Sequence, residues 1–217
     1  MADLDTKIRL CLFGASPDTG NLGVCALFLS VLSAIADRYP SASVTVFDHG
    51  RSVREDEIRL SGGTFRFQRC GANHSRRYYR QDSLLNMRVS VAFGGLGNPG
   101  IKAIVESDAV LDVSGADRFA DLYAKKRFQT MTQTKRFVLD LSGPHILLPK
   151  TLGPFDQPAS SQTRVRSHMA RARDARSYQI LREFRSDQLD PARCRVGVGM
   201  AFAMPPRRNR SSAAAPQ

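Results

Sequence analysis

Four short polar segments carry side chains that can contact a ligand, and the first three of them also contain glycine or proline: residues 14–23, 114–121, 150–155 and 173–177. In a doubly wound parallel sheet, ligands bind beyond the carboxyl ends of the strands, where the strand order reverses. The residues that follow strands are therefore the useful ones. We expect binding or catalytic chemistry in these four segments.

The first segment is a Gly- and Asn-rich turn between a predicted strand and a predicted helix. It lacks both the G-x-G-x-x-G spacing of dinucleotide sites and the Gly-Lys-Ser/Thr of phosphate-binding loops, which disfavours a nucleotide site. Backbone N–H groups and the dipole of the following helix can still bind an anion, with Asn21 orienting the loop and Gly23 beside it. The alternative is a turn that only connects strand and helix.

The second segment places Ser114, Gly115 and Asp117 after a compact apolar strand. Gly115 allows a ligand to approach the backbone closely, while a hydroxyl and a carboxylate point at it. Asp117 is equally suited to be the N-cap of the next helix.

The last two segments contribute positive charge. Lys150 can bind a phosphate or carboxylate, or it is an ordinary surface lysine. Arg173 and Asp174 form either a plain ion pair or an anion clamp in which the aspartate orients the guanidinium. Spacing alone leaves both pairs of alternatives open.

The four histidines are scattered and define no Ser/His/Asp or Cys/His set. We expect His145, which begins an apolar strand, to be a hydrogen-bonded core residue. The four cysteines form no C-x-x-C pair, which argues against a zinc site and a disulfide framework. Cys11 and Cys25 are expected to be buried. The sequence predicts neither a metal nor a cofactor.

The net charge of +12 comes mostly from the last quarter of the chain. Residues 1–158 carry 20 Lys and Arg against 16 Asp and Glu, and residues 159–217 carry 12 against 4. The basic region has few aromatic residues and no groove-reading motif, so nucleic-acid binding is disfavoured. No apolar run is long enough to span a membrane and the first residues are not those of a signal peptide, which predicts a cytoplasmic protein.

The elements that must position these segments alternate between strands and helices. The apolar patterns predict strands at 7–13, 43–47, 64–68, 108–113, 145–148 and 194–198. They predict helices at 24–39, 84–91, 100–106, 119–141, 161–172 and 178–184, with a mobile loop within 71–100 and a long turn at 149–158. This order indicates an α/β fold with a doubly wound, mostly parallel, Rossmann-like sheet. One domain covers residues 1–204, and residues 205–217 form a disordered tail rich in Arg, Ala and Pro.

Five segments follow one another along about residues 7–206: GASPDTGNLGVCAL, SDAVLDVSGADRFAD, LLPKTLGPF, RARDARSYQIL and VGVGMAFAMPP. Each has low specificity alone, but together and in this order they resemble the polysaccharide pyruvyl transferase family. The resemblance implies transfer of a pyruvyl group from phosphoenolpyruvate to a sugar hydroxyl of a cell-surface polysaccharide. It also implies a fold similar to the N-terminal domain of the glycosyltransferase-B type.

The same resemblance implies roles for individual residues. Phosphoenolpyruvate carries a phosphate and a carboxylate, which arginine and lysine bind well. Arg173 is the first candidate for donor binding and Lys150 the second. The residues implied to line the cleft are Asn21, Gly23, Ser114, Gly115 and Asp117.

Two departures from the family pattern matter. The chain is short, so the half that usually carries the catalytic histidine is expected to be missing, and Met200 stands where similar sequences have aspartate. No catalytic residue is assigned. An incomplete enzyme whose tail reflects a frameshift or early stop would expose apolar surface and self-associate. The alternatives are a genuine short protein, a non-catalytic binding domain that keeps half of the fold, and a glycosyltransferase that uses a nucleotide-sugar.

Overall fold

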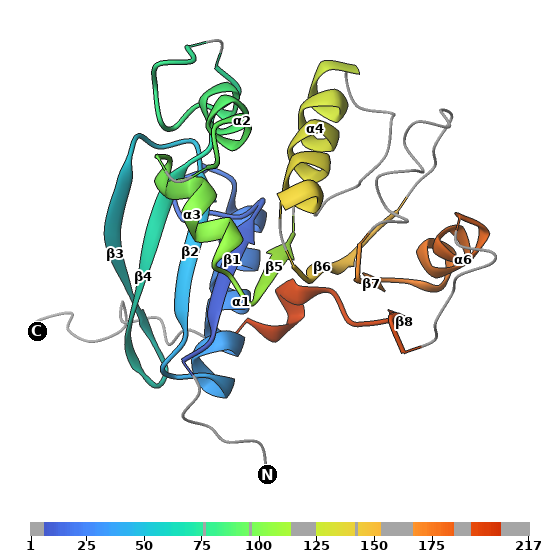
Figure 1. Ribbon diagram of the computed structural model, residues 1–217. Helices are drawn as coiled ribbons and strands as arrows, with labels where there is room; N and C mark the ends of the chain where they lie inside the picture. Colours follow the sequence, from blue (N-terminus) through green and yellow to red (C-terminus); the bar gives the residue numbers. More distant parts are fainter. Residues whose placement is uncertain are drawn as a thin grey trace, which may run out of the picture.

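A computed structural model of the chain describes residues 7–75, 77–95, 97–113, 125–141, 143–152, 167–184 and 192–204. These segments build one eight-stranded sheet in the order β3-β4-β2-β1-β5-β6-β7-β8 (Figure 1). The strands are β1 (Arg9–Phe13), β2 (Ser43–Asp48), β3 (Val53–Leu60), β4 (Gly63–Gly71), β5 (Ala109–Asp112), β6 (His145–Lys150), β7 (Met169–Ala172) and β8 (Cys194–Val196). All neighbours pair in parallel except the β3–β4 hairpin, so the sheet is mostly parallel.

Helices cover both faces of this sheet (Figure 1). The helices are α1 (Leu22–Arg38), α2 (Leu84–Ala92), α3 (Pro99–Val105), α4 (Lys125–Leu141) and α6 (Ala175–Phe184), and η1 (Met200–Ala203) is a short 3-10 turn. No helix in the described part of the chain is long and apolar enough to cross a membrane.

Successive side chains along the central strands point to opposite faces of the sheet, and each face has its own apolar core. In β1, Leu10 and Leu12 pack with α1 on one face, whereas Cys11 and Phe13 pack with α2, α3 and α4 on the other. A third apolar cluster joins α6 to β6, β7 and β8 through residues that include Leu181 and Ala170. Because parallel strands are buried on both faces, they read as nearly continuous apolar runs.

The α/β class, the mostly parallel sheet and most of the predicted elements are confirmed. The sequence does not predict β3, whose side chains are alternately exposed and half-buried because it is the charged edge strand. The helix predicted at 161–172 is wrong over Met169–Ala172, which is β7, because pairing of this segment with β6 and with β8 outweighs its helix propensity. Part of that helix, at 161–166, lies outside the described residues.

The turn predicted at 149–158 is also wrong in part. Pro149 and Lys150 belong to β6, and residues 153–158 lie outside the described segments. Proline has no backbone N–H to donate, so it locally weakens the ladder, and the register of β6 against β7 shifts between Leu147 and Lys150. The tail predicted at 205–217 lies outside the described residues as well.

Candidate functional site

The strand order reverses between β1 and β5, which is where a doubly wound sheet opens a crevice at its carboxyl edge. Phe13, the last residue of β1, is in register with Asp112, the last residue of β5. The first predicted segment therefore begins beside the end of β5. The strand ends of β6 and β7 continue the same edge.

Asp112 is the centre of a buried charge cluster at this edge. Lys135 of α4 donates a hydrogen bond from Nζ to Asp112 Oδ2. Lys150 Nζ lies 3.7 Å from Asp112 Oδ1, and His145 Nε2 lies 3.6 Å from Oδ2. All four side chains are at least nine-tenths buried. Among the described residues, two ammonium groups and an imidazole thus converge on one carboxylate.

The irregularity in β6 explains how His145 and Lys150 reach the same carboxylate. Residues separated by an odd number point to opposite faces of a regular strand. The register of β6 against β7 shifts by one residue between Leu147 and Lys150, which reverses this alternation and allows Lys150 to reach the same carboxylate as His145. Pro149 lies within this shift, directly before Lys150.

Burial and charge shift the pKa values of this cluster strongly. Burial alone would raise the pKa of Asp112, but Lys135, Lys150 and His145 outweigh it and hold that pKa well below its usual range. Burial lowers the pKa of Lys150 well below that of an ordinary lysine, although Asp112 opposes the shift. The cluster therefore keeps its carboxylate ionised and weakens the hold of Lys150 on its proton.

His145 is hydrogen-bonded and buried, as the sequence predicts. Its Nδ1 lies 3.1 Å from Ser167 Oγ, and its backbone N–H donates to His168 Nδ1. Burial lowers the pKa of His145 to about 4, against the opposing pull of Asp112. The imidazole is therefore neutral at pH 7.

Arg173 follows β7 at the same edge, next to Lys150. Its backbone N–H donates to the Lys150 carbonyl over 3.0 Å, and its side chain is exposed. The methylene groups of Arg173 lie over Gly199, where an added Cβ would meet Arg173 Cδ at 2.9 Å. Gly199 thus leaves room for the arginine stem, and the guanidinium extends toward solvent.

The aspartate beside Arg173 has a structural role. Asp174 accepts hydrogen bonds from the backbone N–H and the hydroxyl of Ser177, so it closes the first turn of α6. Ser177 Oγ in turn accepts from the Leu152 N–H at 2.9 Å. This relay joins the segment after β6 to the segment after β7. Two of the four predicted segments therefore meet through Lys150, Leu152 and Arg173.

The first turn has a tightly specified geometry. Gly14 and Gly20 adopt φ values of +87° and +67°, a region that favours glycine. Asn21 is the N-cap of α1, and its Oδ1 accepts from the N–H groups of Gly23 and Val24 at 2.9 and 3.2 Å. Asn21 therefore orients the loop as expected, and its own side chain uses the Gly23 amide. The expectation that Cys25 is buried is wrong, because Cys25 is only half-buried, and its Sγ donates to the Pro17 carbonyl.

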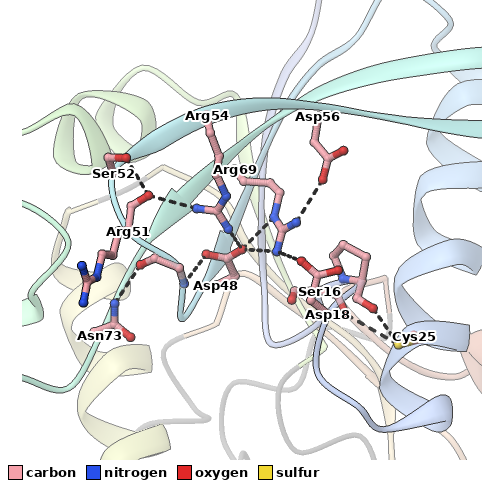
Figure 2. Close-up of polar contacts among 12 residues, drawn as sticks. Ser16, Asp18, Cys25, Asp48, Arg51, Ser52, Arg54, Asp56, Arg69 and Asn73 are labelled. Atoms are coloured by element: carbon pink, nitrogen blue, oxygen red, sulfur yellow. Dashed lines mark hydrogen bonds and ion pairs between the residues drawn. The ribbon is translucent and has the colours of Figure 1, made fainter.

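A second charge cluster holds this turn to the edge hairpin (Figure 2). Asp48, at the end of β2, accepts from Arg54 and Arg69, and Arg69 also pairs with Asp18 and Asp56. Burial alone would lower the pKa of Arg69, but Asp18, Asp48 and Asp56 raise it above its usual value. In dinucleotide-binding sheets an acidic residue about 20 residues beyond the glycine-rich turn binds the ribose. In this sheet Asp48, the acidic residue that ends β2, already pairs with Arg54 and Arg69.

The remaining predicted site residues, Ser114, Gly115 and Asp117, lie outside the described residues. Sequence reasoning missed Asp112 and Lys135. A lone carboxylate within an apolar strand was a usable signal for Asp112. Nothing in the spacing marks Lys135, which is 23 residues away. Within the described segments, no group of three or more His, Cys, Asp or Glu side chains is placed to hold a metal ion.

The sequence matches no protein-family model, and no curated protein is significantly similar to it. The function is therefore inferred from the residues and their geometry, together with the five ordered segments of the sequence.

Proposed function

We propose that the carboxyl edge of β5, β6 and β7 binds phosphoenolpyruvate, and that the protein acts in transfer of its pyruvyl group to a sugar hydroxyl of a cell-surface polysaccharide. The proposal includes a fold similar to the N-terminal domain of the glycosyltransferase-B type and a reaction in the cytoplasm. The observation that carries it is the meeting of Lys150 and the exposed Arg173 on adjacent strand ends.

Arg173 is the residue proposed to contact the donor. Its stem is held over Gly199 and its backbone is tied to Lys150, so a bound anion restricts little further motion. A guanidinium presents paired N–H donors that match a phosphate or a carboxylate. The Arg173 side chain is positively charged and is exposed to solvent at this edge of the sheet.

Lys150 is proposed to act from beneath this surface. Its Nζ is buried with that of Lys135 beside Asp112, and in its protonated form it supplies positive potential in a medium of low polarity. Coulombic interactions are stronger there than in water. Asn21 and Gly23 border the edge at β1, where their hydrogen bond fixes the shape of the turn. Ser114, Gly115 and Asp117 belong to the proposal through the sequence resemblance alone.

The proposed reaction transfers three carbons as a ketal. The methylene carbon of phosphoenolpyruvate gains a proton, a sugar hydroxyl adds to the adjacent carbon, and phosphate leaves as a second hydroxyl closes the ring. The first step needs a general acid. No described residue is assigned that role. The side chains at this edge are proposed to bind and orient the donor.

A nucleotide-sugar glycosyltransferase is the less favoured alternative. The first turn lacks the glycine spacing of dinucleotide sites, and Asp48 is occupied by Arg54 and Arg69. Thermal stabilisation by UDP or GDP, with none by phosphoenolpyruvate, would favour that alternative.

The direct test incubates the full chain with phosphoenolpyruvate and a galactoside. We expect phosphate release that depends on the acceptor, together with a new pyruvyl methyl signal in the NMR spectrum of the sugar. Binding of phosphoenolpyruvate without turnover would indicate the non-catalytic binding domain. Absence of both binding and turnover would contradict the proposal.

A further inference from the structure

A surface cavity of about 350 Å³ lies beside β2 and β4, away from the β5–β7 edge. Its lining residues are Arg51, Ser52, Arg80, Gln81 and Asp82. This volume is at the lower end of the range for small-molecule sites. We propose that this cavity binds the oxyanion group of a small ligand, a carboxylate or a phosphate, between Arg51 and Arg80.

The walls of the cavity are fixed by a close approach of two loops at Gly71, the last residue of β4. A Cβ on Gly71 would lie 2.3 Å from the Gly50 carbonyl oxygen and 2.6 Å from Asp82 Cβ. Asn73 Nδ2 links the same two loops, because it donates to Gly50 O at 2.9 Å and to Asp82 Oδ2 at 3.0 Å. The cavity is therefore a built feature of the fold.

Arg80 is held in position before any ligand binds. It pairs side-on with Asp82, donating from Nε to Oδ1 at 3.0 Å and from Nη2 to Oδ2. This pair uses one edge of the guanidinium and leaves the Nη1 donors for another acceptor. The hydrogen bond from Arg80 holds the pKa of Asp82 below its usual value, so the carboxylate stays ionised and keeps orienting the arginine. A positioned guanidinium loses little further freedom on binding.

Arg51 supplies the second positive charge, from a loop whose backbone is also fixed. Its carbonyl accepts from Arg54 Nη1 at 3.3 Å and from Ser52 Oγ at 2.6 Å. Ser52 adopts φ +57°, uncommon for a residue with a side chain, and its carbonyl accepts from the Gly71 N–H. Figure 2 shows the Arg51 guanidinium turned away from Asp48, so the exposed arginine does not join that cluster.

These charges favour an anion. The lining holds two guanidinium groups and one carboxylate, and that carboxylate already accepts from Arg80 and Asn73. A carboxylate or phosphate would gain charge-assisted hydrogen bonds from both arginines. The side chains of Ser52 and Gln81 add neutral polar groups for the rest of the ligand.

The test is an NMR titration of the full chain with inorganic phosphate and, separately, with malonate, at constant ionic strength kept with chloride. We expect saturable shifts of the Arg51 and Arg80 Nε–H signals with at least one of the two anions, and the stronger of them identifies the ligand class. Arg51→Gln should weaken this binding about tenfold. Arg59→Gln removes the same charge from an exposed position on β3 and should leave binding unchanged.

Equal weakening by the two variants would reduce the effect to general electrostatics and overturn the proposal. Shifts that do not saturate, or that appear only near Arg173, would also overturn it. Because the wild-type Nε–H signals report on the cavity directly, the result does not depend on the folding of a variant. Arg173→Ala should leave this titration unchanged, which separates the cavity from the proposed donor site.

Discussion

Asp112 and Asp48 each end a parallel strand of the sheet, and each is a buried carboxylate that contacts two cationic side chains, but their surroundings differ. Asp112 faces Lys135 and Lys150, and the neighbouring His145 adds a further group that can become positive. Around Asp48, Arg69 is shared with Asp18 and Asp56. Among the described residues, cations exceed carboxylates in the first cluster and carboxylates exceed cations in the second.

Similar strand ends in one sheet can therefore have different uses. The Asp48 cluster pairs its two arginines with three carboxylates and connects the first turn, β2 and the β3–β4 hairpin, which is a structural task. The Asp112 cluster concentrates ammonium groups under an edge where Arg173 is exposed. Positive potential that is only partly offset favours an anionic ligand. We therefore place the proposed donor site at β5–β7 and away from β2.

The largest expected difference between the clusters comes from neutralising each central carboxylate. Asp112→Asn should reduce the free energy of unfolding by about 3–5 kcal/mol, because it removes the charge that two buried ammonium groups contact. Asp48→Asn should cost less, because Arg69 keeps Asp18 and Asp56. Urea denaturation of both variants measures this. Equal losses would mean that the two clusters do not differ in charge balance.

A second difference should appear in the dependence of stability on pH. The pKa of folded His145 is about 4, whereas an unfolded histidine titrates near 6.5. As the pH falls from 6.5 to 4, the unfolded chain takes up a proton that the folded chain does not. The contribution of His145 is therefore complete above pH 6.5 and is lost by pH 4, by about 3 kcal/mol.

His145→Asn isolates this effect, because asparagine does not titrate. The variant should show a shallower fall in unfolding free energy between pH 6.5 and 4 than the wild type, as measured by urea denaturation at each pH. His49→Asn changes an exposed histidine next to Asp48 and is the matched control. If His49→Asn flattened the profile as much as His145→Asn, the assignment to the buried cluster would be wrong.

The smallest expected effect lies at the rim of the Asp48 cluster. Asp18 is 66% exposed although its partner Arg69 is nearly buried. Asp18→Asn should therefore cost no more than about 1 kcal/mol, and the cost should shrink in high salt. Glu57→Gln, from an exposed pair on the same hairpin, is a control with a still smaller effect. A loss as large as that of Asp48→Asn would show that the first turn depends on this pair.

Most of the sheet could be predicted from sequence because its central strands are buried on both faces and read as apolar runs. β3 was missed because an edge strand carries charges that imitate a loop. β7 was misread because Met169–Ala172 consists of good helix formers, and only its place between two strands makes it extended. Local propensity cannot report such pairing.

The site was predicted in part, for a related reason. Lys150, Arg173 and Asn21 lie at or just after the ends of strands, and the topology brings the first two together. Lys135 reaches Asp112 only through the packing of α4 on the sheet, which no spacing in the chain encodes. The shift in β6 that turns Lys150 toward Asp112 was visible only as a proline next to the lysine. Buried charge clusters are tertiary features assembled from residues that look ordinary one at a time.

The most direct test of the account is calorimetric titration of phosphoenolpyruvate into the wild type, Arg173→Ala and Arg182→Ala. Arg182 lies in the last turn of α6 and is exposed, so its loss matches the change in charge without touching the strand ends. We predict saturable binding to the wild type and to Arg182→Ala, and none to Arg173→Ala. Binding that is unchanged in Arg173→Ala, or absent from the wild type, would contradict a donor site at the β5–β7 edge.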